Sequence, residues 1–343
     1  MVKLNANSKI SFKIGRQIWS YDDERLLSKR NWLNTAMSYD GILSSFKLEK
    51  AEIDLGISIN NNKENHFGND YREIVDYKID DSTGIVTPVY NAQKLKTLNF
   101  LYFKYPFSDD LYLSYISLLS GAQDINSDSK LFFKLTQGLN VFYKSDNLFG
   151  HFSGYFQMGE NQQGKEVVAY MTSAELGTKL SNNKISVSFG TDVISGNNYE
   201  SNNYDYSKLD NNFDLLYGAR YKFYGYLNHF TLTDRHTKNA GLVDLYFKSG
   251  YNITTKTKIE FHYHYFQTMY KAINPNGGFY DNFLGSEIDV VLSHKFSKEV
   301  LLKSGFAYGL PTNILAEFKN VKADMVNPFS SYLMLVVTPK FFY

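Results

Sequence analysis

The stretch KISVSFGTDVI, residues 184–194, decides the fold because polar and apolar side chains alternate along it at almost every step. Successive side chains of a β-strand point to opposite faces of the sheet, so this period of two predicts a strand with one apolar and one polar face. The apolar face carries Ile185, Val187, Phe189 and Val193, and the polar face carries Lys184, Ser186, Ser188 and Asp192.

The same alternation recurs along nearly the whole chain, in segments that end in Asn, Asp, Gly, Ser or Lys, which is the pattern of successive β-hairpins. Residues 52–59, 243–249, 258–265 and 287–296 show it most clearly. We therefore expect an all-β, transmembrane antiparallel β-barrel of about 14 strands, an even count typical of bacterial barrels. The expected strands are 8–17, 38–49, 51–60, 97–105, 110–119, 130–144, 149–159, 166–181, 184–195, 241–252, 256–268, 285–296, 300–309 and 331–343.

Alternation alone also fits a soluble sandwich with its apolar face inward, so other features have to choose between the two arrangements. The strands follow one another without helical segments, and small residues lie on the polar face, as a crowded lumen needs; examples are Gly56, Gly190, Gly250 and Gly305. The C-terminus, Phe341-Phe342-Tyr343, resembles the terminal aromatic signal of outer-membrane barrels. Its strand sends Leu333, Leu335, Val337, Phe341 and Tyr343 toward lipid and Lys340 toward the pore.

The composition supports the membrane arrangement and excludes several classes of protein. The chain of 343 residues has 28 Tyr and 27 Phe but only 2 Trp, and aromatic girdles at the two membrane interfaces use such residues. Net charge is +1, from 36 basic and 35 acidic residues, so nothing indicates nucleic-acid binding. Cysteine is absent, which excludes disulfides and thiolate metal sites. Residues 1–8 carry no apolar signal segment, so we expect a mature or truncated chain.

We expect a single barrel domain over residues 1–343, with connections of very different length at its two ends. Residues 61–94, 196–222 and 310–330 are predicted to be long extracellular loops, whereas Ser181-Asn182-Asn183 is typical of a short periplasmic turn. Such asymmetry is a trait of outer-membrane barrels. The long loops are expected to be solvated and to plug part of the pore.

Several short motifs carry a resemblance to a known family. GRQ at 15–17, YDDERLL at 21–27, NWLNT at 31–35 and SYDG at 38–41 occur in the order seen in the alginate-export porin family, which the chain resembles from about residue 9 to its end. Residues 188–196, FDLLY at 213–217, FYGY at 223–226 and HYHYF at 262–266 extend the similarity, although Tyr221 replaces a family histidine. Full-length relatives form barrels of 18 strands. The resemblance thus leaves three options: a chain that lacks about four N-terminal strands, a smaller barrel, or closure with another chain.

The resemblance also implies a role for the few arginines. In the family, lumen Arg and Lys side chains form a positive constriction for anionic sugar polymers, and the planar guanidinium binds carboxylates in two-pronged fashion. An ion-pair network that stiffens the barrel wall is an equally good interpretation. The expected pore-lining residues are Arg16, Asp23, Glu24, Arg25, Asp40, Asp192, Arg220, Glu260, His262, His264 and Asp289.

Neither a metal site nor a catalytic site is predicted. Glu260, His262 and His264 form Glu-x-His-x-His on one strand face, and His-x-His can chelate a metal. The sequence names no third ligand, so hydrogen bonding within the lumen is the preferred interpretation. No Ser/His/Asp order or phosphate-binding glycine motif stands out, and we expect neither cofactor nor catalytic residue.

The expected function is passive diffusion of hydrophilic solutes, with anionic saccharides among the candidates, through a charged lumen in the bacterial outer membrane. Two other classes remain open: a barrel hydrolase acting on lipid or peptide, and a surface adhesin or assembly subunit acting through its long loops. The expected partners are membrane lipid, lipopolysaccharide and the solute, without nucleic acid. The chain is expected to be a monomer or a part of an outer-membrane complex.

Overall fold

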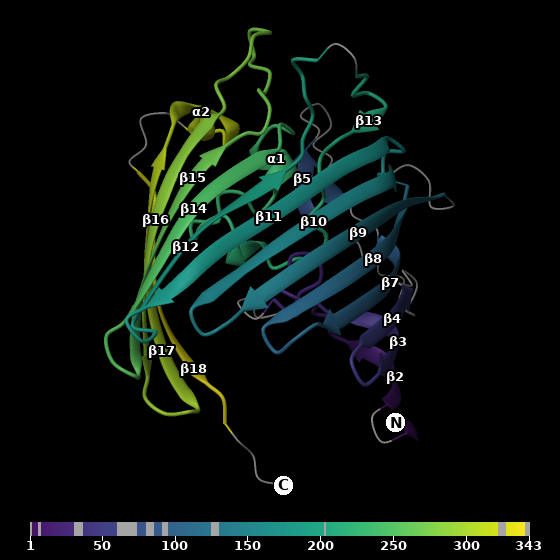
Figure 1. Cartoon of the computed structure of the whole chain (residues 1–343). Helices are drawn as coiled ribbons and strands as arrows, with labels where there is room; N and C mark the ends of the chain where they lie inside the picture. The colour runs from purple at the N-terminus through teal and green to yellow at the C-terminus, as the bar shows by residue number, and fades with distance from the viewer. Residues whose placement is uncertain are drawn as a thin grey trace.

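The computed structural model describes residues 2–5, 8–30, 37–59, 74–79, 86–90, 95–124, 130–201, 204–321 and 327–339. Figure 1 shows long, tilted antiparallel strands that curve round an interior. In chain order they are β1 (Val2–Asn5), β2 (Ser8–Gln17), β3 (Tyr39–Lys47), β4 (Glu52–Ile59), β7 (Leu95–Pro106), β8 (Leu111–Gln123), β9 (Leu131–Lys144), β10 (Leu148–Glu160), β11 (Glu166–Leu180), β12 (Ile185–Ile194), β14 (Leu242–Asn252), β15 (Thr257–Gln267), β16 (Phe283–Lys295), β17 (Val300–Pro311) and β18 (Phe329–Val337).

These strands form one 16-stranded sheet, in which each strand pairs with the next along the chain and the short β13 (Leu209–Asp210) joins β11 in parallel. All 14 expected strands are present, so the prediction of an antiparallel all-β fold is confirmed. The path starts at β1 and ends at β18, and among the described residues no ladder joins these two strands. The terminal Phe341-Phe342-Tyr343 lies outside the described residues.

Exposure along the strands shows an inside-out arrangement. Ile14, Phe189 and Leu333 are 77%, 67% and 73% exposed on the outer face, whereas Asn140 and Glu287 are fully buried on the inner one. A water-soluble sandwich would bury the first set and expose the second. The expected orientation of the two faces is therefore confirmed, because the apolar side chains form the outside of the barrel and the polar ones its lumen.

Glycines on the lumen face leave room for aromatic rings from the neighbouring strand. A Cβ atom at Gly56 would overlap the ring of Phe100, and one at Gly190 would overlap Tyr246. Each pair sits on adjacent strands, where an aromatic side chain can lie over a glycine of its neighbour. This explains why the sequence has small residues among the polar positions of its strands.

The two ends of the barrel differ as expected in the length of their connections. At one end, short turns join β8 to β7, β10 to β9, β12 to β11, β15 to β14 and β17 to β16. Three consecutive residues of one such turn, Ser181, Asn182 and Asn183, have positive φ between 52° and 65°, a conformation that asparagine tolerates well. All long connections lie at the other end, where Figure 1 shows the helices and β13.

Two long connections fold into the barrel. We call residues 18–30 and 211–240 together the plug; the second part includes η1 (Arg220–Lys222) and α1 (Thr233–His236). Trp19, Leu27, Phe213 and Phe230 are at most 1% exposed there, and the apolar core cluster of the described residues includes them. The second half of the predicted loop 196–222 turns inward and buries its apolar side chains inside the barrel, as expected of a loop that plugs part of the pore.

The other predicted loops are described in part. Within 61–94, β5 (Ile74–Ile79) and β6 (Val86–Tyr90) pair as a separate hairpin, and the rest lies outside the described residues. Residues 310–330 begin inside β17, contain α2 (Asn313–Phe318) and reach β18. Which side of the membrane these connections face stays a prediction. Among the described residues, no helix has the length and apolarity to cross a bilayer.

Candidate functional site

The first part of the plug is tied to the barrel wall by aromatic and carboxylate contacts. Trp19 stacks on Tyr39 with ring centroids 4.6 Å apart. Asp22 has a positive φ of 50° and accepts hydrogen bonds from Ser114 Oγ at 2.7 Å and Tyr102 Oη at 2.9 Å. Burial raises the pKa of the Asp22 carboxyl, although these two hydroxyls counteract the shift. Asp22 of the YDDERLL motif therefore points into the wall.

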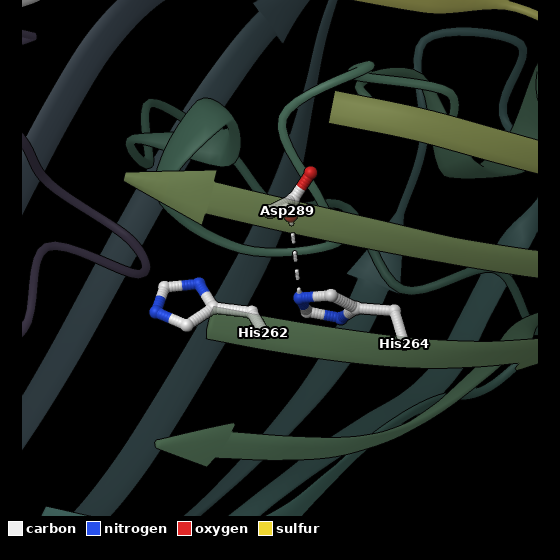
Figure 2. A group of neighbouring side chains, drawn as sticks. All are labelled: His262, His264 and Asp289. Atoms are coloured by element: carbon white, nitrogen blue, oxygen red, sulfur yellow. Dashed lines mark ion pairs between the residues drawn. The ribbon is translucent and has the colours of Figure 1, made fainter. Parts of the chain in front are cut away.

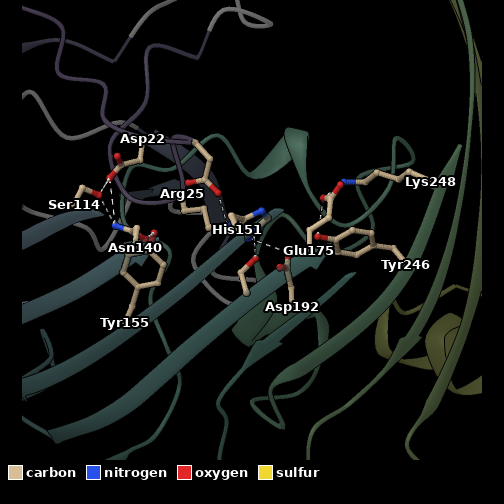
Figure 3. Close-up of polar contacts among 12 residues, drawn as sticks. Asp22, Arg25, Ser114, Asn140, His151, Tyr155, Glu175, Asp192, Tyr246 and Lys248 are labelled. Carbon is tan, nitrogen blue, oxygen red and sulfur yellow. Dashed lines mark hydrogen bonds and ion pairs between the residues drawn. The ribbon is translucent and has the colours of Figure 1, made fainter. Parts of the chain in front are cut away.

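Arg25 is the central ion-pairing residue of the lumen (Figure 3). It is 3% exposed; its Nε donates to Asp23 at 2.8 Å and its Nη1 donates to Asp192 of β12 at 2.9 Å. The guanidinium lies 4.0 Å from the ring centroid of Phe223. Burial opposes the charged form of Arg25, but the two carboxylates outweigh it and raise its pKa. A buried pair of this kind is costly to break, because one partner is left charged and unpaired.

Backbone bonds and an ion pair join the two parts of the plug. The amides of Tyr217 and Ala219 donate to the carbonyls of Leu26 and Glu24 at 3.0 and 2.8 Å. Lys222 forms an ion pair with the Glu24 carboxylate. The two segments, nearly two hundred residues apart in sequence, thus form one packed unit.

Asp214 is a second residue through which the plug is attached to the barrel wall. Gln157 of β10 donates to the Asp214 carbonyl and accepts from its amide, both at 2.8 Å. The carboxylate accepts from Lys134 Nζ at 2.7 Å and lies 3.7 Å from Arg220. Burial favours the neutral acid, yet Lys134 and Arg220 outweigh it and lower the pKa of Asp214. Arg220 also donates to the carbonyls of Thr231 and Leu216, at 2.8 and 3.1 Å.

Residues 225–227, which we call the tip of the plug, contact two carboxylates of β16. The amide of Leu227 donates to Glu287 at 2.7 Å, and that of Tyr226 donates to Asp289 at 3.3 Å. Gly225 has a φ of +79°, and a Cβ there would lie 2.5 Å from the Glu287 carboxyl. Only glycine allows this close approach without strain.

Two cavities lie against the plug. One of about 280 Å³ is lined by wall and plug residues that include Arg25, His151, Glu175, Asp192 and Lys248. Glu175 accepts from Lys248 Nζ at 3.1 Å across the wall. The other, of about 510 Å³, lies at the long-loop end and is lined by residues such as Phe132, Lys134, Gln163, Asp214, Arg220 and Arg235. Among plug residues, those between Asn212 and Arg220 and those from Leu232 to Arg235 line the larger cavity, whereas Asp23, Arg25 and residues 222–226 line the smaller one.

The expected pore-lining residues divide into three groups. Asp23, Arg25 and Asp192 meet in the ion-pair network described above, Glu24 pairs with Lys222 inside the plug, and Arg220 lines the larger cavity. Glu260 pairs with Lys258 at 2.6 Å, and His262, His264 and Asp289 line the smaller cavity. Arg16 and Asp40 pair with each other at 2.6 Å but are exposed and share the outer face of Phe12, Ile14 and Ile42. Their expected place in the lumen is wrong, since strand alternation turns them outward.

Several lumen residues were missed by sequence reasoning. Asp22, Glu175, Asp214, Lys222, Asp244, Lys248 and Glu287 all take part in the polar contacts of the lumen or plug. Strand alternation already places Asp244 and Glu287 on the polar face. No local signal points to Asp214 or Lys222, whose partners come from distant segments.

Comparisons with known proteins agree with this architecture. Residues 2–95 match the family model described as alginate export, which confirms the resemblance over the segment that carries the 15–41 motifs. A search of curated proteins found no match.

The fold is shared with solved outer-membrane porins of Pseudomonas aeruginosa. OccK3 (OpdO) aligns at 12% identity and a TM-score of 0.55 over 96% of this chain and 77% of its own. OccK11 (OpdR) aligns at 11% identity and 0.55, over 96% and 77%, and OpdK at 11% and 0.56, over 96% and 76%. The chain therefore has the fold of an outer-membrane β-barrel porin, and its N-terminal segment matches the alginate-export family.

Proposed function

We propose that the chain is a passive diffusion channel for hydrophilic solutes, narrowed by its plug. The observation that carries this proposal is the polar lumen with a cavity on either face of the plug, inside a barrel with an apolar outer surface. The barrel acts as a monomer, with membrane lipid and lipopolysaccharide against its outer face.

The lining of the larger cavity suits saccharides, including acidic ones. Side-chain amides of Asn161, Gln162 and Gln163 can bond sugar hydroxyls, and the ring of Tyr217 can contact a pyranose. Arg235 lines the same space and can bind a carboxylate, beside Lys134 and Arg220, which pair with Asp214. OpdK, a neighbour of 11% identity with a TM-score of 0.55, was determined with vanillate, a carboxylate. We therefore extend the proposal to carboxylated solutes.

The arginines have separate roles in this proposal. Arg25 has its donors committed to Asp23 and Asp192, which supports a stiffening role. Arg235 is exposed in the larger cavity and is the better candidate for solute contact.

Reconstitution in planar bilayers tests the proposal. The wild-type protein should give discrete conductance steps, and oligo-uronates should interrupt the current more strongly than neutral oligosaccharides of equal length. Arg235→Ala should weaken the block by the acidic sugars, whereas Arg16→Ala, on the outer face, should leave it unchanged. The absence of conductance from folded protein would contradict the proposal that the chain is a channel. Equal block by acidic and neutral oligosaccharides would contradict only the proposed preference for acidic solutes.

A further inference from the structure

Three side chains on two neighbouring strands lie close together at the wall of the smaller cavity (Figure 2). A ring nitrogen of His262, a ring nitrogen of His264 and a carboxylate oxygen of Asp289 all lie within 4.8 Å of one another. Two ligands of one tetrahedral zinc ion lie roughly 3.3 Å apart, given Zn–N distances of about 2.0 Å. Small side-chain rotations would therefore bring the three atoms to ligand distance.

The register between β15 and β16 explains why Asp289, the third ligand, could not be identified from the sequence. His262 and His264 share the lumen face of β15, and the β15–β16 ladder places Asp289 directly opposite His262. Opposed residues on one face have Cβ atoms about 5 Å apart. The same ladder puts Glu287 opposite His264, so a second buried carboxylate adjoins the group.

A neighbouring carboxylate holds His264 in the orientation that a metal ligand needs. Asp244 of β14 lies 2.9 and 3.0 Å from His264 Nδ1, through its two oxygens. Nε2 of the same ring then points to Asp289, 3.9 Å away. Metal-binding histidines usually donate their second ring N–H to such a carboxylate, which fixes the tautomer and leaves the other nitrogen free to bind.

The site also has more buried negative charge than its surroundings balance. Asp244 and Asp289 are 0% and 1% exposed, and Oδ1 of Asp289 has no hydrogen-bond partner among the described residues. The cations of the cavity are engaged elsewhere: Arg25 with Asp192, Lys248 with Glu175 and Lys222 with Glu24. A buried carboxylate without compensation is costly, so a cation bound here would be strongly favoured.

We propose that His262, His264 and Asp289 form a binding site for a divalent transition metal of the Zn²⁺ class, with Asp244 as the positioning residue. Two imidazoles and one carboxylate suit such an ion better than Ca²⁺ or Mg²⁺, which prefer all-oxygen sites. Three protein ligands leave a coordination position open toward the cavity. Because Asp289 also accepts the Tyr226 amide, the ion would join β15, β16 and the tip of the plug. The inference goes beyond the channel function and does not depend on it.

Calorimetric titration of the folded, detergent-solubilised protein with ZnCl₂ tests the site, with CaCl₂ and MgCl₂ as competing ions. We expect one Zn²⁺ per chain and unchanged affinity in excess Ca²⁺ or Mg²⁺. His262→Ala and Asp289→Asn should each weaken binding at least tenfold, and Asp244→Asn should weaken it by a smaller factor. His294→Ala is the matched control, because His294 lies on β16 but outside the group, beside Thr257.

A further measurement distinguishes an ion held by these three ligands from an ion bound at another part of the chain. Co²⁺ should give the intense visible absorption of a four-coordinate site, which His262→Ala removes while the far-ultraviolet circular dichroism of the barrel persists. The proposal is overturned if Zn²⁺ does not bind, or if it binds equally well to wild type, His262→Ala and Asp289→Asn. Neither outcome bears on the conductance of the channel.

Discussion

The barrel wall and the plug differ in the kind of side chain that they bury: the wall buries polar side chains, and the plug buries mainly apolar ones. The wall places its apolar side chains outside, as at Phe189, and its polar ones inside, as at Asn140. The plug buries an apolar cluster within that polar interior and attaches itself through ion pairs such as Arg25–Asp192. The wall thus depends on lipid and on local strand pairing, whereas the plug depends on a few long-range contacts. Variants should therefore affect the two regions separately.

The largest expected effect comes from cutting the central ion pair of the plug. Arg25→Ala leaves Asp23 and Asp192 without their shared cation, and breaking such a buried pair costs about 3–5 kcal/mol. The plug should loosen and single-channel conductance should rise, while the barrel still assembles. Bilayer recordings and urea unfolding measure the two effects. Arg16→Ala, which removes an exposed pair on the outer face, should change neither; equal effects of both variants would contradict a special role for Arg25.

Next in size is a charge placed on the lipid face of the wall. Phe189→Arg should destabilise the barrel by about 2–4 kcal/mol without altering the plug, because an arginine near the bilayer midplane is costly. Unfolding by guanidinium in lipid vesicles measures the loss. Ser186→Arg, three residues earlier on the lumen face, should cost much less. A reversed order of the two variants would mean that the faces of β12 have been assigned the wrong way round.

A smaller effect is expected at the tip of the plug. Gly225→Ala forces a side chain into a φ of +79° and against Glu287, a strain of about 1–3 kcal/mol. Only the contact with β16 should weaken, seen as extra current fluctuations in bilayer recordings. Gly277→Ala provides the control, since Gly277 also has a positive φ of 80° but no atom within 4 Å of the added Cβ. Unchanged current fluctuations in the Gly225→Ala variant would show that the tip of the plug does not control the width of the pore.

The smallest effect should be the response of the plug to mild acid. Burial, followed by the charge of Lys319, lowers the pKa of both His229 and His236 to about 4. For these bases the undocked state binds protons first, so docking is fully stable above about pH 6.5 and weakens as pH falls toward 4. Conductance should rise over that range. His229→Gln with His236→Gln should flatten the response, and an unchanged profile would assign it to other lumen groups, such as Glu287 or Asp289.

The sequence predicts the wall well and the plug poorly, for a physical reason. Alternation is a local property of the chain, so it gives the position of a strand such as β12 and shows which face of it Phe189 occupies. The same rule applied to Phe12, Ile14 and Arg16 would have turned Arg16 outward, away from the lumen where its motif suggested a role. The family resemblance suggested the lumen face for Arg16, whereas the residue lies on the outer face.

Plug contacts and the histidine group require information that no local pattern contains. Arg25 meets Asp192 across 167 positions of sequence, and Asp214 meets Gln157 across 57. Asp289 becomes a neighbour of His262 only through the register of β15 on β16. The residue types of the site could thus be named from the sequence, but their grouping could not.

The orientation of the wall can be tested most directly with single labels, because the protein has no cysteine of its own. Nitroxide labels on Phe189→Cys and Leu333→Cys in lipid vesicles should be relaxed by oxygen, which concentrates in the bilayer, and not by a water-soluble nickel complex. A label on Ser186→Cys should show the reverse. If nickel reached Phe189 and oxygen alone reached Ser186, the apolar face would be turned to water and the account of a membrane channel would be wrong.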